Sequence, residues 1–168
     1  MSDASSKLVL ALYPFTRGYA FVLFEGPNRP FDWAVKEIKE KHKNIRTLDE
    51  IKKLIGRYHP HLIVIEDLTP GRSRRTSRIR KLYRLLARLA EREAVEMYHC
   101  PKHHLTEYFG RLSKYELAKI IAIQLPGFAH RIPPLRKAWT AEDPRQALFD
   151  AAALGIAFYG LEQPRRES

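Results

Sequence analysis

Hydrophobic residues fall into short runs over the first hundred positions of the chain, and these runs have the length of strands. The first two runs are apolar at both odd and even positions, as strands buried on both faces of a sheet are. Turn-forming residues separate the first three runs, which predicts an antiparallel meander. The predicted strands cover residues 7–13, 19–24, 31–35 (continuing toward Ile38), 62–65 and 95–98.

Helical periodicity fills the intervals between the later strands. Thr47 and Ser113 are each followed three residues later by Glu, which is the spacing of a capping box, so we expect a helix to begin at each. Asp143 followed by Pro144 is a good pair for another helix start. The predicted helices run from Thr47 to about Gly56, over 76–93 and 101–109, from Ser113 onward, and over 144–159.

This order predicts an α/β fold with a five-stranded mixed sheet flanked by helices. Three antiparallel strands come first, and two parallel strands are added through crossovers. Right-handed crossovers place the fourth strand beside the first, which brings Tyr13 close to Glu66.

Length and composition favour one soluble domain. A chain of 168 residues fits a single domain, expected here over residues 7–161, with a flexible start at 1–6 and a frayed tail at 162–168. Its start lacks the pattern of a signal peptide, and no apolar run reaches the roughly 18 residues of a membrane span. The single Cys100 agrees with a reducing compartment, so we expect a cytoplasmic protein without membrane association.

Charge changes this picture. The net charge of +11 and the isoelectric point near 9.9 favour a polyanionic partner, because Lys and Arg displace counterions from phosphates. Seven basic residues and no acid lie between Arg72 and Arg84. A basic protein tuned only for solubility is the alternative. The residues expected to bind nucleic acid are Arg72, Arg74, Arg75, Arg78, Arg80, Lys81, Lys114, Arg136 and Lys137.

Acidic residues at three places suggest a metal site. Glu66 directly follows a buried strand, where open α/β sheets place their sites, and Asp150 interrupts a helix that is otherwise apolar. Asp143 lies about two helical turns, about 10 Å, before Asp150, so Glu142 or a bent helix start is needed to complete the set. Oxygen ligands favour Mg²⁺ or Mn²⁺, and two such ions are the standard device for phosphodiester hydrolysis. We therefore expect Glu66, Asp150, Asp143 and Glu142 as catalytic residues, the first three as metal ligands.

Three segments resemble a known family in order and in spacing. They are residues 10–19 (LALYPFTRGY), 63–66 (IVIE) and 149–157 (FDAAALGIA), and the resemblance spans roughly residues 7–160. They are similar to the signature segments of RuvC-like Holliday junction resolvases, of the ribonuclease-H-like superfamily. The resemblance implies that fold, metal-binding roles for Glu66 and Asp150, and Glu142 or Asp143 as a remaining late acid. It also implies Mg²⁺- or Mn²⁺-dependent cleavage of branched DNA by a homodimer, since a four-way junction needs two symmetric cuts.

The sequence departs from the family at two places. The family's first strand ends in an Asp-Pro-Gly-like turn whose Asp bridges both metals, whereas Tyr13 occupies that position here. A phenol with a pKa near 10 is a poor Mg²⁺ ligand. Late acids in the family commonly lie about three residues apart, but Ala147 and Ala153 flank Asp150. Three functions stay open: an endonuclease on branched DNA with impaired activity, a catalytically inactive nucleic-acid-binding protein, and an RNA-processing nuclease.

Overall fold

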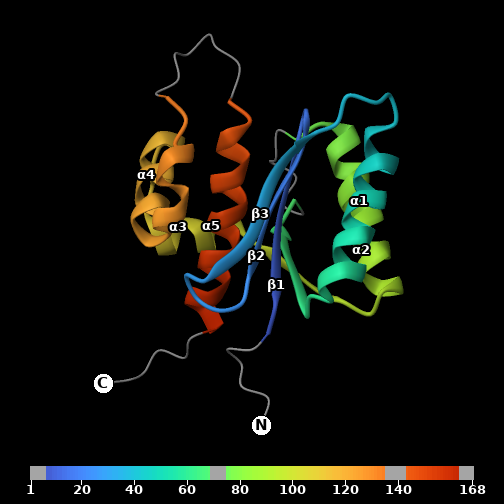
Figure 1. The fold of residues 1–168 in the computed structure, drawn as a ribbon, viewed down its shortest axis with the longest axis horizontal. Helices are drawn as coiled ribbons and strands as arrows, with labels where there is room; N and C mark the ends of the chain where they lie inside the picture. Colours follow the sequence, from blue (N-terminus) through green and yellow to red (C-terminus); the bar gives the residue numbers. More distant parts are fainter. Residues whose placement is uncertain (1–6, 69–74, 135–142, 163–168) are drawn as a thin grey trace.

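The computed structural model describes residues 7–68, 75–134 and 143–162 (Figure 1). Of the termini expected to be flexible or frayed, 1–6 and 162–168, residues 1–6 and 163–168 lie outside the described residues, and Glu162 ends the last helix. None of the described helices is long and apolar enough to cross a membrane. The elements in chain order are β1 (Val9–Phe15), β2 (Gly18–Phe24), β3 (Pro30–Glu37), α1 (Lys43–Tyr58), β4 (Leu62–Glu66), α2 (Ser77–Arg92), β5 (Glu96–Cys100), α3 (Lys102–Phe109), α4 (Lys114–Gln124), the 3-10 helix η2 (Pro126–Arg131) and α5 (Arg145–Glu162).

The five strands form one mixed sheet in the order β3-β2-β1-β4-β5. Strands β1, β2 and β3 pair antiparallel, whereas β4 pairs parallel with both β1 and β5. The register places Val9 opposite Leu62 and Ala11 opposite Val64. The predicted sheet is confirmed, including the placement of β4 beside β1.

Helices cover both faces of the sheet. Helices α1 and α2 lie on one face, and α5 lies on the other with α3 and α4 outside it (Figure 1). Along β1, Leu10 and Leu12 belong to the core under α1 and α2, whereas Val9 and Ala11 belong to the core under α5. This alternation explains why β1 is apolar at every position.

Small residues let α5 approach the sheet closely. A Cβ atom added at Gly155 would lie 2.2 Å from Cε2 of Phe24 on β2. Ala151, Ala152 and Ala153 are buried on the same helix. This close packing fixes the position of Asp150 relative to β1.

The predicted helix starts have different outcomes. Ser113 caps α4 by accepting a hydrogen bond from the Glu116 amide, as expected. The expected start of α1 at Thr47 is wrong, because α1 begins at Lys43 and Thr47 is buried inside it. The first turn gains a tertiary contact instead, since the Asn44 side chain exchanges hydrogen bonds with Arg78. The spacing of capping residues along the sequence does not predict a contact with another helix.

Candidate functional site

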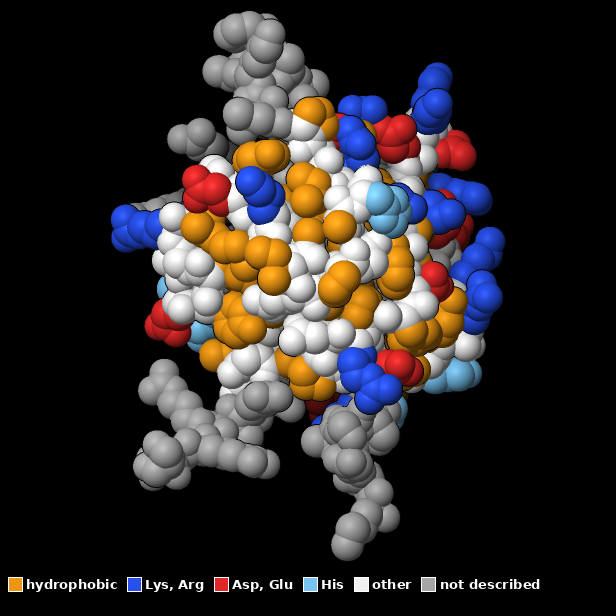
Figure 2. All heavy atoms as spheres, turned by 60° about the vertical axis from the view of Figure 1, so that its left-hand side comes forward, with side chains coloured by type: hydrophobic (Ala, Val, Ile, Leu, Met, Phe, Trp, Pro, Cys, Tyr) orange, Lys and Arg blue, Asp and Glu red, His pale blue; other side chains and the backbone are white. Residues whose placement is uncertain are grey.

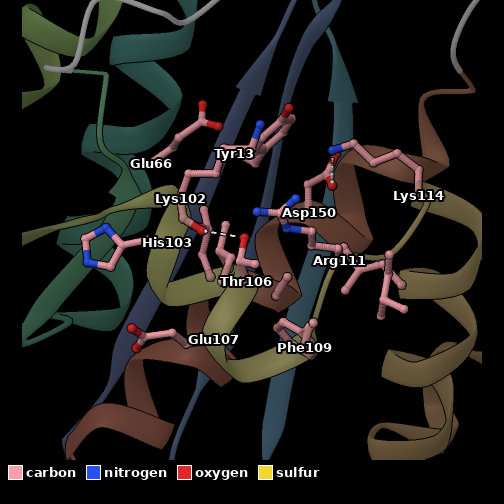
Figure 3. A pocket seen from close by; sticks show the side chains of 16 residues that line it. Tyr13, Glu66, Lys102, His103, Thr106, Glu107, Phe109, Arg111, Lys114 and Asp150 are labelled. Atoms are coloured by element: carbon pink, nitrogen blue, oxygen red, sulfur yellow. Dashed lines mark hydrogen bonds and ion pairs between the residues drawn. The ribbon is translucent and has the colours of Figure 1, made fainter.

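A cleft opens at the carboxyl ends of the parallel strands. Strands β1, β4 and β5 end at the same edge of the sheet, and α3 and α4 form the facing wall. The cleft has a volume of about 990 Å³ (Figure 3). Its charged and aromatic lining residues are Tyr13, Glu66, Lys102, His103, Glu107, Phe109, Arg111, Lys114 and Asp150, and its aliphatic wall includes Leu105, Leu117 and Leu154.

The expected neighbours meet in this cleft. Figure 3 shows Tyr13 of β1 between Glu66 of β4 and the contact that joins Lys114 to Asp150. The order of strands brings Tyr13 and Glu66 together as predicted, and α5 adds Asp150. Two of the four expected acids therefore lie at one site.

Tyr13 contacts a cation that comes from the segment before α2. The Arg75 guanidinium carbon lies 4.6 Å from the centre of the Tyr13 ring, and Nη1 donates a hydrogen bond of 3.3 Å to the phenol oxygen. Nη2 donates to the carbonyl oxygen of Pro14 and, over 3.3 Å, to the hydroxyl oxygen of Tyr83. Burial opposes the charge on Arg75, but the surrounding Tyr83, Tyr13 and Glu66 outweigh it and raise the pKa of Arg75 above its usual range. Arg75 is thus a permanent cation.

Glu66 is held by two side chains on its own side of the cleft. Nε of Arg75 lies 3.4 Å from its Oε1, and the side chains of Arg75 and Glu66 are 17% and 30% exposed. The Tyr83 hydroxyl donates a hydrogen bond of 3.4 Å to the same oxygen. Burial raises the pKa of Tyr83 above its usual range, so its phenol stays a neutral donor.

Asp150 has a cationic partner from another helix. Nζ of Lys114 at the start of α4 lies 2.7 Å from Oδ1 of Asp150. Gln146, one turn earlier on α5, donates a hydrogen bond of 3.5 Å to that oxygen. The other oxygen, Oδ2, is buried and has no hydrogen-bond partner among the residues that the structure describes. The sequence expectation that this carboxylate meets a partner is met by Lys114.

Of the two remaining expected acids, Asp143 is described by the structure, and it does not join this group. Asp143 accepts hydrogen bonds from the amide and the guanidinium of Arg145, and these lower the pKa of Asp143. It lies before the first turn of α5 and is not among the residues that line the cleft. Its contacts are those of a helix cap, which the sequence offered as the alternative. Glu142 lies outside the described residues.

Of the residues expected to bind nucleic acid, one lines the cleft, some lie elsewhere in the described structure, and some lie outside the described residues. Arg78 donates hydrogen bonds to the carbonyl oxygens of Phe15 and Thr16, so like Arg75 it fastens the segment around the start of α2 to the turn after β1. Arg80 and Lys81 lie on α2 and do not line the cleft. Lys114 lines it. The other expected residues, Arg72, Arg74, Arg136 and Lys137, lie outside the described residues.

Two basic residues of the cleft escaped the sequence reasoning. Lys102 and Arg111 line it from the first residue of α3 and from the segment between α3 and α4, and both are exposed. The available signal was topological. Because β5 was predicted to run parallel to β4, the residues after its end had to reach the same sheet edge as Glu66.

The described residues do not fit a two-metal centre. No group of three His, Cys, Asp or Glu side chains that could hold a metal ion occurs within residues 7–68, 75–134 and 143–162. Tyr13 offers a phenol, which is a poor ligand for a hard cation, and Glu66 and Asp150 each face a side-chain cation. Any ion bound to the remaining oxygens of Glu66 and Asp150 would lie beside Arg75 and Lys114, whose positive charges oppose it.

Comparison with solved structures identifies the fold. The chain is similar to RuvC of Thermus thermophilus, with a TM-score of 0.65 and 16% identity over 92% of this chain and 95% of that one. It is also similar to T. thermophilus RuvC in complex with a Holliday junction substrate, with a TM-score of 0.63, 16% identity and the same coverage. No protein-family model and no curated protein matches the sequence. The protein therefore has a RuvC-like, ribonuclease-H-like fold, as predicted from the three segments.

Proposed function

We propose that this protein binds branched DNA in the cleft between Tyr13, α3 and α4, and that it binds without needing a divalent metal ion. The basic wall of the cleft carries this proposal. Lys102 at the start of α3, Arg111 between α3 and α4, and Lys114 at the start of α4 line the cleft at the sheet edge that also holds Tyr13 and Glu66. A chain with a net charge of +11 supplies the long-range attraction for a polyanion.

The fold supports DNA with a branch as the ligand. One of the similar structures is a RuvC bound to a Holliday junction. On the helical face that Figure 2 brings forward, apolar side chains lie across the middle, whereas charged side chains lie mainly at the margins. This distribution favours the cleft over that helical face as the place where phosphates bind. Because a four-way junction has two-fold symmetry, the proposal includes a homodimer. Light scattering measures the mass of the protein in solution and so tests for the dimer.

Binding titrations test the proposal directly. Fluorescence anisotropy compares a labelled four-way junction with a duplex of the same length in EDTA, over a series of salt concentrations. We expect tighter binding of the junction, and we expect Lys102→Gln with Arg111→Gln to weaken it about tenfold and lower the salt slope by roughly 2. The same titration with a hairpin RNA of matched length tests for an RNA partner, which tighter binding of the RNA than of the junction would indicate.

The control removes the same charge from a different surface. Arg84 and Arg88 are exposed on the outer side of α2 and do not line the cleft. Arg84→Gln with Arg88→Gln should change junction affinity much less than the cleft pair does. Equal losses in the two double variants, or no preference of the parent for a junction, would contradict binding in the cleft.

A metal-dependent endonuclease is the second candidate, and one observation favours it. The buried Oδ2 of Asp150 faces the cleft region without a hydrogen-bond partner among the described residues, so it offers one oxygen to a ligand. Incubation of junction DNA with Mg²⁺ or Mn²⁺, beside Glu66→Gln and Asp150→Asn, tests this candidate. Cleavage by the parent that both variants lose would favour the endonuclease over the binding protein.

A further inference from the structure

We infer that two cations of this chain, Arg75 and Lys114, take the place of divalent metal ions in the cleft, with Tyr13 between them. The inference deepens the proposed function, because it assigns the charges that balance Glu66 and Asp150. It rests on the proposed function for the identity of the partner, a nucleic acid. It follows from four contacts at one site: Arg75 with Glu66, Lys114 with Asp150, and each of the two cations with the ring of Tyr13.

Arg75 is fixed in place by groups on three elements. It contacts Tyr13 and the Pro14 carbonyl on β1, Glu66 at the end of β4 and Tyr83 on α2. Its side chain is largely buried, so these contacts hold the guanidinium in one position. A guanidinium has donors in a rigid planar fork, which suits several acceptors at once. Arg75 therefore supplies a fixed positive charge beside Glu66.

Lys114 supplies the second charge from the opposite side of Tyr13. Its Nζ lies 2.7 Å from Oδ1 of Asp150 and 5.8 Å from the centre of the Tyr13 ring. The ring thus has the Lys114 ammonium and the Arg75 guanidinium both within the range of cation–π attraction. The aromatic ring at position 13 attracts both cations without adding a negative charge to the group, whereas an aspartate would add one.

The charges of this group sum to zero without a metal ion. Two carboxylates and two side-chain cations balance each other, and the phenol is neutral. A divalent ion that approached Glu66 or Asp150 would meet the positive charge of Arg75 or Lys114 at close range. Restoring a carboxylate at position 13 alone would place it against Arg75, which would neutralise it. Tyr13 and Arg75 consequently act as a pair, and both must be changed before a metal ion can bind.

Manganese titrations without nucleic acid test this inference. Electron paramagnetic resonance of free Mn²⁺ measures binding to the parent, to Tyr13→Asp, and to Tyr13→Asp combined with Arg75→Gln. The matched control combines Tyr13→Asp with Arg78→Gln, because Arg78 also donates hydrogen bonds to the carbonyl oxygens of Phe15 and Thr16, but its side-chain partner is Asn44 on α1. Circular dichroism checks that each variant is folded.

The expected pattern separates the two changes. The parent and Tyr13→Asp should show no saturable Mn²⁺ binding up to about 1 mM, a range in which weak protein sites for hard cations bind. The Tyr13→Asp/Arg75→Gln variant should bind at least about tenfold more tightly than Tyr13→Asp, and its melting temperature should rise with Mn²⁺. The Arg78→Gln control should behave like Tyr13→Asp.

Several results would overturn the inference. One is that the parent binds Mn²⁺ saturably and that Glu66→Gln removes this binding. Another is that folded Tyr13→Asp binds Mn²⁺ equally well with and without Arg75→Gln. If the double variant does not fold, the melting temperature of the parent decides: it should be the same in EDTA and in millimolar Mg²⁺, and a rise in Mg²⁺ that Glu66→Gln abolishes would refute the metal-free site. Junction affinity in EDTA is measured in a separate experiment. If the protein does not bind junction DNA, the Mn²⁺ titrations still test whether Arg75 and Lys114 take the place of metal ions.

Discussion

The Lys114–Asp150 contact gives the most informative test of how the site is held together. Asp150 is almost fully buried, with 5% of its side chain exposed, whereas 57% of the Lys114 side chain is exposed. Replacing Lys114 by Met removes the charge and keeps most of the apolar stem. The Asp150 carboxylate then lies on a buried helix with only the weak hydrogen bond from Gln146. We expect Lys114→Met to destabilise the fold.

The magnitude follows from the distance and the exposure. At the observed 2.7 Å, two unit charges attract by about 1.5 kcal/mol at a dielectric constant of about 80 and by about 6 kcal/mol at about 20. The exposed ammonium is screened by water, which brings the value toward the lower figure. We therefore expect Lys114→Met to lower the free energy of unfolding by about 2 kcal/mol and the melting temperature by about 4–8 °C.

A double-mutant cycle measures the pair itself. Urea unfolding of the parent, Lys114→Met, Asp150→Asn and the double variant should give a coupling energy of about 1.5 kcal/mol. Asp150→Asn alone should cost less than Lys114→Met, because the ammonium it leaves behind is exposed and hydrated. Lys119→Met on the outer side of α4 is the control and should be nearly neutral. Additive losses from the two single substitutions would refute the reasoning.

Three further predictions concern packing, burial and pH. Gly155→Ala should destabilise the fold by about 1–3 kcal/mol in urea unfolding, because the added Cβ would collide with the Phe24 ring. Gly56→Ala, at an exposed position of α1 with open space around it, should stabilise the fold by about 0.5–1 kcal/mol. Burial raises the pKa of Cys100 to about 11, so a thiol reagent at about pH 8 should label it only after unfolding. Hydrogen bonds from the neighbouring arginine hold the pKa of Asp143 below its usual range; the stability they give is present at neutral pH and is lost as the pH falls below about 4, so Asp143→Asn should match the parent only in acid.

Sequence patterns predicted the sheet because each strand carries its own signal. Strands buried on both faces are apolar at every position, and the handedness of crossovers fixed the neighbour of β1. The approach of Tyr13 to Glu66 follows from these two facts. The start of α1 did not follow, because its first turn is stabilised by Arg78 from another helix.

The partners of the acids lay beyond such reasoning. Lys114 and Asp150 are 36 residues apart on two helices whose relative position depends on the packing of α4 against α5. Arg75 was expected to bind nucleic acid because it lies in a basic run, and local sequence shows only that charge is present. Which acceptor a long side chain reaches is decided by the tertiary structure, and Arg75 reaches Tyr13 and Glu66 instead of pointing away from the protein.

These contacts give Tyr13 a physical reason to be where it is. Carboxylates brought together at the end of a sheet repel one another, and a fold can offset this repulsion either with metal ions or with its own cations. Here the described site has two carboxylates beside the ring of Tyr13, and each carboxylate is in contact with one cation. The two residues depend on each other: an arginine buried next to divalent metal ions would be repelled, and Tyr13 without Arg75 would leave Glu66 with a weaker partner. In the proposed metal-free site Tyr13 and Arg75 therefore act as one unit, in which the ring adds no negative charge and the guanidinium balances Glu66.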